Sequence, residues 1–417
     1  MKILSLSHSD INGGAARASF RIFEALHKSG VEIEMLVKYK ESAHEKVLLA
    51  DDFTKQGLAG QIDLFKTKVE NRWYKWKIGN YNHRKDTFIS NLSSVSLSEA
   101  FAKLDFDILH LHWISHQFLD LEELKYIKKP IVWTLHDCWA FTGICHYFDD
   151  CDNYRGACGS CNLLNSARDR DLSREIWEKK SRIYRQCNIH VVTPSKWLGE
   201  SASRSSLLGR FPITVIPYPI NTGKFKSVDK VLAKERLGLS RDRNYILYGA
   251  MNALDDVRKG FHFVRRVFEL LPMGKHSNIE LLILGSNVKE LSNINGYRIR
   301  YLGSINQDTQ LMDILSAADV VIAPSISENL SLMIMEAMAC ETPVVGFNIG
   351  GNPDLIDHKR NGYLAAPFSV EDLSHGMMWC LNENHNDRLS AEARKKVFNN
   401  FNEKRISAEY LKLYESL

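Results

Sequence analysis

Short apolar strands alternate with helical segments along the whole chain, and this pattern most restricts the possible folds. In the first half the predicted strands are residues 2–7, Glu32–Lys38, Asp107–Trp113, Pro130–Asp137 and His190–Ser195. In the second half they are Asn244–Ala250, Ile279–Gly285, Ile299–Gly303, Asp319–Ser325 and Pro343–Phe347. Near-continuous Val, Ile and Leu strands separated by helices indicate parallel sheets covered on both faces. We therefore predict an α/β protein with two Rossmann-like, doubly wound domains, which bind ligands at the carboxyl ends of their strands.

The length of the chain supports two domains. At 417 residues it exceeds the size at which a single hydrophobic core stops growing. We place the N-terminal domain at residues 1–208, the C-terminal domain at residues 209–390, and a C-terminal helix that packs back on the first domain at residues 391–417. The proline-containing segment Gly209–Lys224 is the predicted crossing between the domains.

Composition excludes some classes of protein. The chain has 54 basic and 50 acidic residues, and this balance is too even to indicate a nucleic-acid partner. The apolar start is too short for a signal peptide, and no apolar run approaches the length of a transmembrane helix. We therefore expect a cytoplasmic protein whose eight cysteines are thiols or metal ligands rather than disulfides.

Two carboxylates frame an apolar helical segment in the second half. Glu336 lies inside the run Leu332–Cys340, and Glu328 precedes that run. A buried carboxylate is costly unless it is paired or hydrogen-bonded, and a ligand rich in hydroxyls would supply partners. The alternative is that Glu328 is a solvated loop residue and Glu336 a structural acid bonded to backbone.

An anion site is predicted between these two acids. A helix is expected to start near its N-cap Ser331, after the strand Asp319–Ser325. Free backbone N–H groups at a helix start favour phosphate. The predicted ligand-binding stretch is Asn329, Leu330, Ser331 and Leu332, followed by Glu336. An acid, a phosphate-binding helix start and a second acid match a sugar nucleotide laid along the strand ends.

The pair Glu328 and Glu336, in the order PSxSE…EAMA…PVV…GG, resembles the Glu-x7-Glu signature of family-4 retaining glycosyltransferases with the GT-B fold. The resemblance covers nearly the whole chain and implies a cleft between the two domains. The further matching elements are the glycine loop Ile11–Arg21, the basic site Arg258–Phe261 and the GGxPE-like element Gly350–Ile356. Trp133–Tyr147 with the cysteines after it is similar to the subgroup of colanic-acid, O-antigen and exopolysaccharide synthesis.

The resemblance implies roles for residues on the donor side, in the C-terminal domain. Glu336 matches the acid that holds the ribose hydroxyls, and Glu328 the acid near the transferred sugar. Lys259 matches the lysine on the diphosphate. This chain reads Gly249–Asn252 where the family usually has an arginine, so Arg258 is assigned that part. The implied donor is a UDP- or GDP-sugar.

The N-terminal domain is expected to lie on the acceptor side. His136 matches the histidine that faces the donor sugar, or it is a structural group at a strand end. Gly13 and Gly14 follow the first strand and precede a helix, where they would let a phosphate or acceptor approach the backbone, or form only a turn. His110 and His112 line the acceptor side or pack in the core.

The resemblance also implies retention by front-face attack, without a catalytic metal. Asp105–Asp107 and Asp169–Asp171 mimic a metal-binding DxD motif, but we interpret both as solvated acids. The implied acceptor is a saccharide, carried on a polyprenyl diphosphate. The alternatives are a nucleotide-sugar epimerase on the same scaffold and a catalytically inactive assembly subunit.

Four cysteines fall within one short segment: Cys145, Cys151, Cys158 and Cys161. The terminal CxxC is typical of a zinc knuckle, and four thiolates suit a closed tetrahedral site. We predict structural zinc, with free thiols or an occasional disulfide as the alternatives.

The segment Lys55–Lys85 combines basic residues with Phe65, Trp73, Tyr74 and Trp76. Basic residues beside interfacial aromatic residues suit an anionic bilayer. Together with the polyprenyl-linked acceptor that the resemblance implies, the segment indicates a peripheral position on the inner face of the plasma membrane. The alternative is a solvated helix with a packed aromatic stripe.

Overall fold

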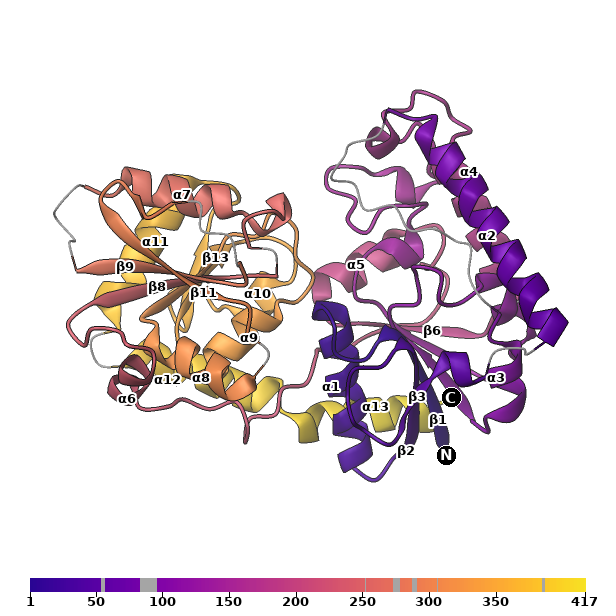
Figure 1. Cartoon of the computed structure of the whole chain (residues 1–417), viewed down its shortest axis with the longest axis horizontal. Coiled ribbons are helices and arrows are strands. Elements are labelled where there is room, and N and C mark those ends of the chain that lie inside the picture. The colour runs from indigo at the N-terminus through magenta and orange to yellow at the C-terminus, as the bar shows by residue number, and fades with distance from the viewer. Residues whose placement is uncertain are drawn as a thin grey trace. The chain divides into compact units, whose positions relative to one another are not determined.

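The computed structural model describes residues 1–53, 57–82, 96–251, 253–272, 278–286, 291–305, 307–384 and 387–417, and side chains in the helix that starts at Gly57 are described from Phe65 onward. The chain divides into two compact units (Figure 1). Unit 1 is Met1–Tyr218 with Ile406–Leu417, and unit 2 is Pro219–Arg405. The division falls inside the predicted crossing Gly209–Lys224, after the predicted boundary at residue 208.

Within the described residues, unit 1 holds a seven-stranded parallel sheet in the order β3-β2-β1-β4-β5-β6-β7. Its strands are β1 (Lys2–Ser9), β2 (Glu32–Tyr39), β3 (Val47–Leu49), β4 (Ile108–Leu111), β5 (Ile131–Thr134), β6 (Ile189–Thr193) and β7 (Ile213–Val215). Its helices are α1 (Gly14–Lys28), α2 (Gly57–Gly79), α3 (Ser98–Lys103), α4 (Leu172–Tyr184), α5 (Lys196–Arg204) and most of α13 (Glu403–Glu415). Short 3-10 helices are η1 (Ala50–Phe53), η2 (Leu121–Tyr126), η3 (Trp139–Phe141), η4 (Asn153–Arg155) and η5 (Asn162–Leu164).

Unit 2 also holds a seven-stranded sheet among its described residues, in the order β10-β11-β9-β8-β12-β13-β14. Its strands are β8 (Asn244–Gly249), β9 (Ile279–Leu284), β10 (Asn293–Ile294), β11 (Tyr297–Gly303), β12 (Val320–Ala323), β13 (Val344–Phe347) and β14 (Gly362–Ala365). Its helices are α6 (Lys230–Arg236), η6 (Val257–Lys259), α7 (Phe261–Leu270), α8 (Asp308–Ala317), α9 (Leu332–Ala339), α10 (Asn352–Leu355), α11 (Val370–Glu383) and α12 (Arg388–Asn400). All pairs in this sheet are parallel except β10 with β11.

Both sheets have the Rossmann order, in which the chain reverses direction across the sheet after its first half. The reversal lies between β1 and β4 in unit 1 and between β8 and β12 in unit 2. The interior strands β5 and β9 are buried at every position, because helices cover both faces of a parallel sheet. The predicted α/β fold with two doubly wound units is therefore confirmed. Ligands of such sheets bind outside the carboxyl ends of the strands at the reversal.

The C-terminal segment forms two helices, α12 and α13, where one helix at residues 391–417 was expected. The chain turns between them because the Phe401 carbonyl accepts a hydrogen bond from the backbone N–H of Ile220 at 2.8 Å. The side chain of Asn402 then accepts a hydrogen bond from the backbone N–H of Arg405 at 2.9 Å, which satisfies one of the free donors at the start of α13.

Among the described helices, none combines the length and the apolar character that a membrane span requires.

Helix α13 is bound to unit 1 by buried polar contacts. The Tyr414 hydroxyl lies 2.7 Å from Nδ1 of His110, which is in β4. The Tyr410 hydroxyl lies 3.0 Å from Oγ1 of Thr134, at the end of β5. His110 also bonds Thr134, with 2.8 Å between Nε2 and Oγ1. The C-terminal helix therefore completes hydrogen bonds inside the first sheet, and His110 is a packed core residue.

We predict that Tyr414→Phe destabilises unit 1, because it leaves Nδ1 of the buried His110 without its partner. Loss of a buried hydrogen-bond partner costs about 1–3 kcal/mol. Thermal and urea unfolding measure the loss. The matched control is Tyr126→Phe, because the Tyr126 side chain is 74% exposed. Equal stability of the two variants would contradict the role of the Tyr414 hydroxyl.

Candidate active site

Three loops meet at the carboxyl edge of the unit 2 sheet with very close backbone contacts. Gly260 has a φ of +78°, and a Cβ atom there would lie 2.0 Å from the carbonyl oxygen of Pro324. Gly350 has a φ of +51°, and its Cβ atom would lie 1.9 Å from the carbonyl oxygen of Glu328. Only glycine permits such an approach in this conformation. The loops after β8, β12 and β13 are thereby held together around Glu328.

Glu328 and Lys259 form an ion pair at this edge. Lys259 Nζ lies 2.8 Å from Glu328 Oε2, and both side chains are largely buried. Burial favours the neutral acid, but the charges of Lys259 and Arg258 outweigh that effect and lower the pKa of Glu328. The Arg258 guanidinium donates to Asp256 at 2.9 Å and to the carbonyl oxygen of Ser327 at 3.3 Å. The structure thus brings three of the predicted site residues together as charged groups.

Helix α9 begins directly after this loop. Ser331 is its N-cap, as predicted, and the Ser331 hydroxyl accepts from the backbone N–H of Ile334 at 3.4 Å. Asn329 and Leu330 are buried ahead of the helix, and Leu332 is its first residue. Glu336 lies in the second turn and is only 4% exposed, so the helix does carry a buried carboxylate.

The unit 1 sheet has its own polar groups at the carboxyl edge. Gly13 follows β1 with a φ of +102° and is the N-cap of α1, and Gly14 is the first residue of that helix. The buried Asp10 holds this loop, because its carboxylate accepts from the backbone N–H groups of Ile11 at 2.9 Å and Ser42 at 2.8 Å. The glycine pair is therefore a fixed, open turn at the reversal of the sheet.

His136 follows β5 and is bonded through both ring nitrogens. Nδ1 lies 2.8 Å from the Tyr218 hydroxyl, and Nε2 lies 3.1 Å from Nδ1 of His112. Burial lowers the pKa of His136 to about 4, so the imidazole is neutral near pH 7. Nε2 of His112 is buried and has no partner among the described residues.

The sequence did not single out Tyr218 or Asp137. Tyr218 lies in the segment interpreted only as a crossing, and no local pattern connects it with His136. Asp137 follows His136 directly and accepts from His146 at 2.6 Å and from Trp113 at 2.9 Å. The adjacency of a histidine and an aspartate at a strand end is the signal that could have identified Asp137.

The four clustered cysteines are free thiols. Burial raises the pKa of the Cys145 thiol, and the thiols of Cys158, Cys161 and Cys151 raise that pKa further. The backbone N–H of Gly143 donates to Cys158 Sγ at 3.2 Å. Even so, no group of three or more His, Cys, Asp or Glu side chains in the described part of the chain is arranged to hold a metal ion.

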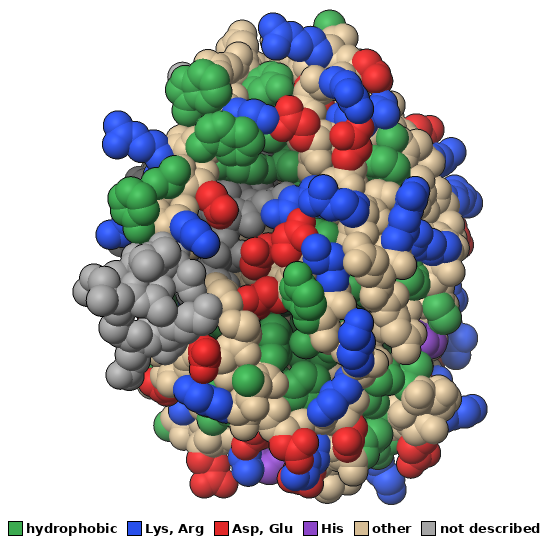
Figure 2. Space-filling model, turned by 90° about the vertical axis from the view of Figure 1, so that its right-hand side faces the viewer, with side chains coloured by type: hydrophobic (Ala, Val, Ile, Leu, Met, Phe, Trp, Pro, Cys, Tyr) green, Lys and Arg blue, Asp and Glu red, His purple; other side chains and the backbone are tan. Residues whose placement is uncertain are grey.

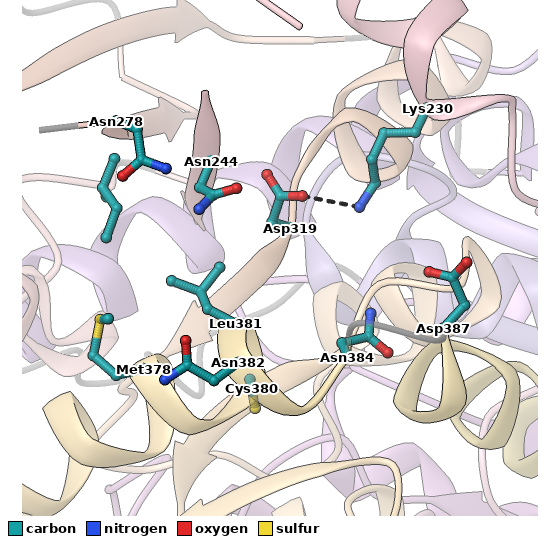
Figure 3. A pocket seen from close by; sticks show the side chains of 11 residues that line it. Lys230, Asn244, Asn278, Asp319, Met378, Cys380, Leu381, Asn382, Asn384 and Asp387 are labelled. Carbon is teal, nitrogen blue, oxygen red and sulfur yellow. Dashed lines mark hydrogen bonds and ion pairs between the residues drawn. The ribbon is translucent and has the colours of Figure 1, made fainter. Parts of the chain in front are cut away.

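A pocket of ≈ 370 Å³ lies at the other edge of the unit 2 sheet (Figure 3). Asn244 and Ile279 begin β8 and β9, and Asp319 precedes β12, so the pocket lies at the amino ends of these strands. Lys230 donates to Asp319 across it at 3.0 Å. The pocket is therefore separate from the cluster of Glu328 and Lys259.

Comparison with known proteins identifies the family. The family model described as Glycosyltransferase Family 4 matches residues 12–224, which is about half of the chain. The chain belongs to glycosyltransferase family 4. A second model, described as Glycosyl transferases group 1, matches residues 232–396 of this family 4 glycosyltransferase, in unit 2.

Two curated relatives carry informative names. The putative colanic acid biosynthesis glycosyl transferase WcaC of Escherichia coli K12 is 23% identical over 361 residues, which are 83% of this chain and 82% of the relative. A UDP-Gal:alpha-D-GlcNAc-diphosphoundecaprenol alpha-1,3-galactosyltransferase of Escherichia coli is 24% identical over 46% of this chain and 50% of the relative.

Solved structures share the fold over the full length. Sucrose-phosphate synthase from Thermosynechococcus elongatus has a TM-score of 0.67 at 18% identity, and covers 100% of this chain and 99% of its own. HepE from Anabaena, in complex with UDP, has a TM-score of 0.63 at 16% identity, with full coverage of both chains. The family resemblance and the GT-B fold predicted from the sequence are confirmed.

We predict that Lys259→Met destabilises this glycosyltransferase in a pH-dependent way. The pKa of Glu328 is lowered in the folded state, so its contribution to stability is present above its unfolded pKa of about 4.3. That contribution is lost as pH falls through the folded pKa. Removing Lys259 leaves a buried carboxylate unpaired, so the loss should be roughly 3–5 kcal/mol at pH 7 and should shrink near pH 4.

Urea unfolding at the two pH values measures this difference. Lys226→Met is the matched control, because Lys226 is an exposed lysine of the same unit. A loss for Lys259→Met that is the same at both pH values would show that the ion pair does not govern the charge of Glu328.

Proposed function

We propose that this glycosyltransferase moves a hexose or related sugar from a nucleoside diphosphate sugar to a saccharide acceptor in bacterial surface polysaccharide synthesis. The observation that carries the proposal is the buried pair of Lys259 and Glu328 beside the start of α9. It combines a cation for a leaving phosphate with an acid for sugar hydroxyls. The relative named for colanic acid synthesis and the UDP complex of HepE support the substrate class.

Each donor group has a proposed partner. The diphosphate is placed at the backbone N–H groups from Asn329 to Leu332, where the start of α9 favours negative charge. Lys259 and Arg258 neutralise the charge that develops on the leaving phosphate. Glu336 holds the ribose hydroxyls, and Glu328 holds a hydroxyl of the transferred sugar. The proposed donor is a UDP- or GDP-sugar.

The proposed chemistry is retention by front-face attack. The bond between the anomeric carbon and the diphosphate oxygen breaks, the acceptor oxygen bonds to the same face, and the acceptor proton passes to the departing diphosphate. A double displacement instead requires a free carboxylate nucleophile at the anomeric carbon. Glu328 suits that role poorly, because its carboxylate is engaged by Lys259. The residues then act by positioning and charge stabilisation.

The proposed acceptor is a saccharide on a polyprenyl diphosphate, used at the cytoplasmic face of the membrane. The support is the name of the relative that acts on a diphosphoundecaprenol substrate. Neutral His136 is proposed to bond a sugar hydroxyl, which would replace either Tyr218 or His112 as the partner of one ring nitrogen. Gly13 and Gly14 leave the backbone open to a ligand at the same edge of unit 1.

Substitution of the two acids should separate their roles. We expect Glu336→Gln to weaken binding of both the free nucleoside diphosphate and the intact donor, by about ten- to a hundredfold for one charge-assisted hydrogen bond. We expect Glu328→Gln to leave diphosphate affinity nearly intact and to lower turnover, because its contact strengthens as the glycosidic bond breaks. Calorimetry with UDP and GDP and their sugars, together with steady-state kinetics, measures both effects.

The control for this pair is Glu383→Gln at the exposed end of α11, which should change neither quantity. Equal losses of diphosphate affinity in Glu328→Gln and Glu336→Gln would show that the assignment of the two acids is wrong.

A chelator tests the two metal predictions together. Catalysis without a metal predicts that transfer persists during brief exposure to excess EDTA, because Lys259 and Arg258 supply the positive charge. We also propose that Cys145, Cys151, Cys158 and Cys161 hold one structural zinc ion, which predicts about one zinc per chain by elemental analysis. Activity that is lost in EDTA and restored by manganese refutes the first prediction. Purified protein that is metal-free and fully stable refutes the second.

A further inference from the structure

Helix α2 presents an apolar stripe to solvent. Its members are Phe65, Val69, Trp73 and Trp76, whose side chains are 68%, 51%, 50% and 63% exposed. Successive members are three or four positions apart, so all four lie on one face of the helix. Of the predicted basic and aromatic segment Lys55–Lys85, residues 55–56 and 83–85 lie outside the described residues. Large apolar side chains gathered on an exposed face usually mark an interaction surface.

The opposite face of α2 is already packed. Tyr74 is buried in a small hydrophobic cluster, and Ile78 and Tyr81 pack against the same cluster. The other members of the cluster are Ile144, Cys161, Leu164, Leu172 and Ile176. The Tyr81 hydroxyl also accepts a hydrogen bond from the backbone N–H of Leu172 at 3.0 Å. The inner face therefore fixes the rotation of the helix, and the apolar stripe faces outward.

Basic side chains border the stripe on both sides. At 100° per residue, Lys68, Arg72 and Lys75 fall along one border, and Lys66 and Lys77 along the other. Lys77 Nζ also lies 4.3 Å from the centre of the Trp73 ring. Residues 65–79 hold these five cations and one acid, Glu70. Lys77 is also ion-paired with Glu175 of α4, so the other four basic residues carry the charge of this face. Figure 2 looks onto the side of unit 1 that carries α2 and shows hydrophobic side chains beside Lys and Arg.

We propose that this face of α2, the four apolar residues with Lys66, Lys68, Arg72 and Lys75, docks on an anionic lipid bilayer. Tryptophan and phenylalanine insert between headgroups while lysine and arginine meet the lipid phosphates.

A second copy of the chain fits this face less well than a bilayer does. The stripe would bury on the order of 400 Å², about half of the roughly 800 Å² per partner found in stable interfaces. Two such faces would also oppose like charges.

The inference extends the proposed lipid-linked acceptor, because docking would hold unit 1 at the surface that carries such a molecule. Its test does not depend on that proposal, since vesicle binding requires neither donor nor acceptor. Failure of vesicle binding would not contradict the proposed donor site. Failure of transfer activity would not contradict the proposed lipid-binding face.

Sedimentation of the full chain with vesicles tests the proposal. We expect binding to vesicles of phosphatidylcholine with about one-third phosphatidylglycerol, weakening with salt, and little binding to phosphatidylcholine alone. The variant Phe65→Ser with Trp76→Ser should bind at least tenfold more weakly. The matched control is Phe398→Ser, which removes a side chain 55% exposed on α12 and should bind like the unaltered protein. Thermal unfolding confirms that each variant is folded.

A charge reversal provides an independent test. Each basic residue near an anionic surface raises the binding constant roughly fivefold. Lys68→Glu removes one such residue and adds a repelled charge, so it should weaken binding to the anionic vesicles about tenfold or more. Lys128→Glu changes an exposed lysine elsewhere in unit 1 and should have a much smaller effect. The proposal is overturned if the unaltered chain does not bind anionic vesicles, or if the Phe65→Ser, Trp76→Ser variant binds them as well as the unaltered chain. It is also overturned if the stripe instead mediates a dimer that the serine variant abolishes.

Discussion

The close backbone contacts at Gly260 and Gly350 are the constraint on which the rest of the proposed donor-side site depends. Each glycine lies against a carbonyl oxygen of the loop after β12, at a distance that no side chain could tolerate. Because Lys259 precedes Gly260 and Glu328 carries the carbonyl that Gly350 meets, the backbone itself fixes the two charged residues as neighbours. Ser331, the N-cap of α9, follows three residues after Glu328, so the cation, the acid and the helix N-terminus are held in one place.

An arrangement of this kind is better explained by ligand binding than by stability. Two charges withdrawn from water gain little net folding energy from each other, whereas one of them left alone is strongly destabilising. The pair keeps Glu328 ionised and Lys259 oriented before any ligand arrives. Unit 1 differs, because its edge carries a neutral histidine in a buried chain of hydrogen bonds from Tyr218 through His136 to His112. One unit thus offers charge and the other offers neutral hydrogen-bonding groups.

Local pattern was enough to predict what depends on neighbouring residues. The apolar strand patterns predicted the two sheets, and Ser331 before an apolar run predicted the start of α9. The positions of Glu328 and Glu336 could be placed because both lie within one loop and one helix. Pairings across long separations could not be predicted: Tyr414 meets His110 and Tyr218 meets His136 only after the sheet of unit 1 has assembled. The break between α12 and α13 likewise depends on a contact with Ile220, far away in the sequence.

The central claim is that the carboxyl edge of the unit 2 sheet binds the nucleoside diphosphate. Hydrogen–deuterium exchange of the full chain with and without saturating UDP or GDP tests it most directly, because backbone N–H groups at the start of α9 are the proposed phosphate donors. We expect slower exchange on ligand binding in residues 256–260 and 326–336. Protection confined to the pocket at the amino ends of β8, β9 and β12, with residues 326–336 unchanged, would contradict it.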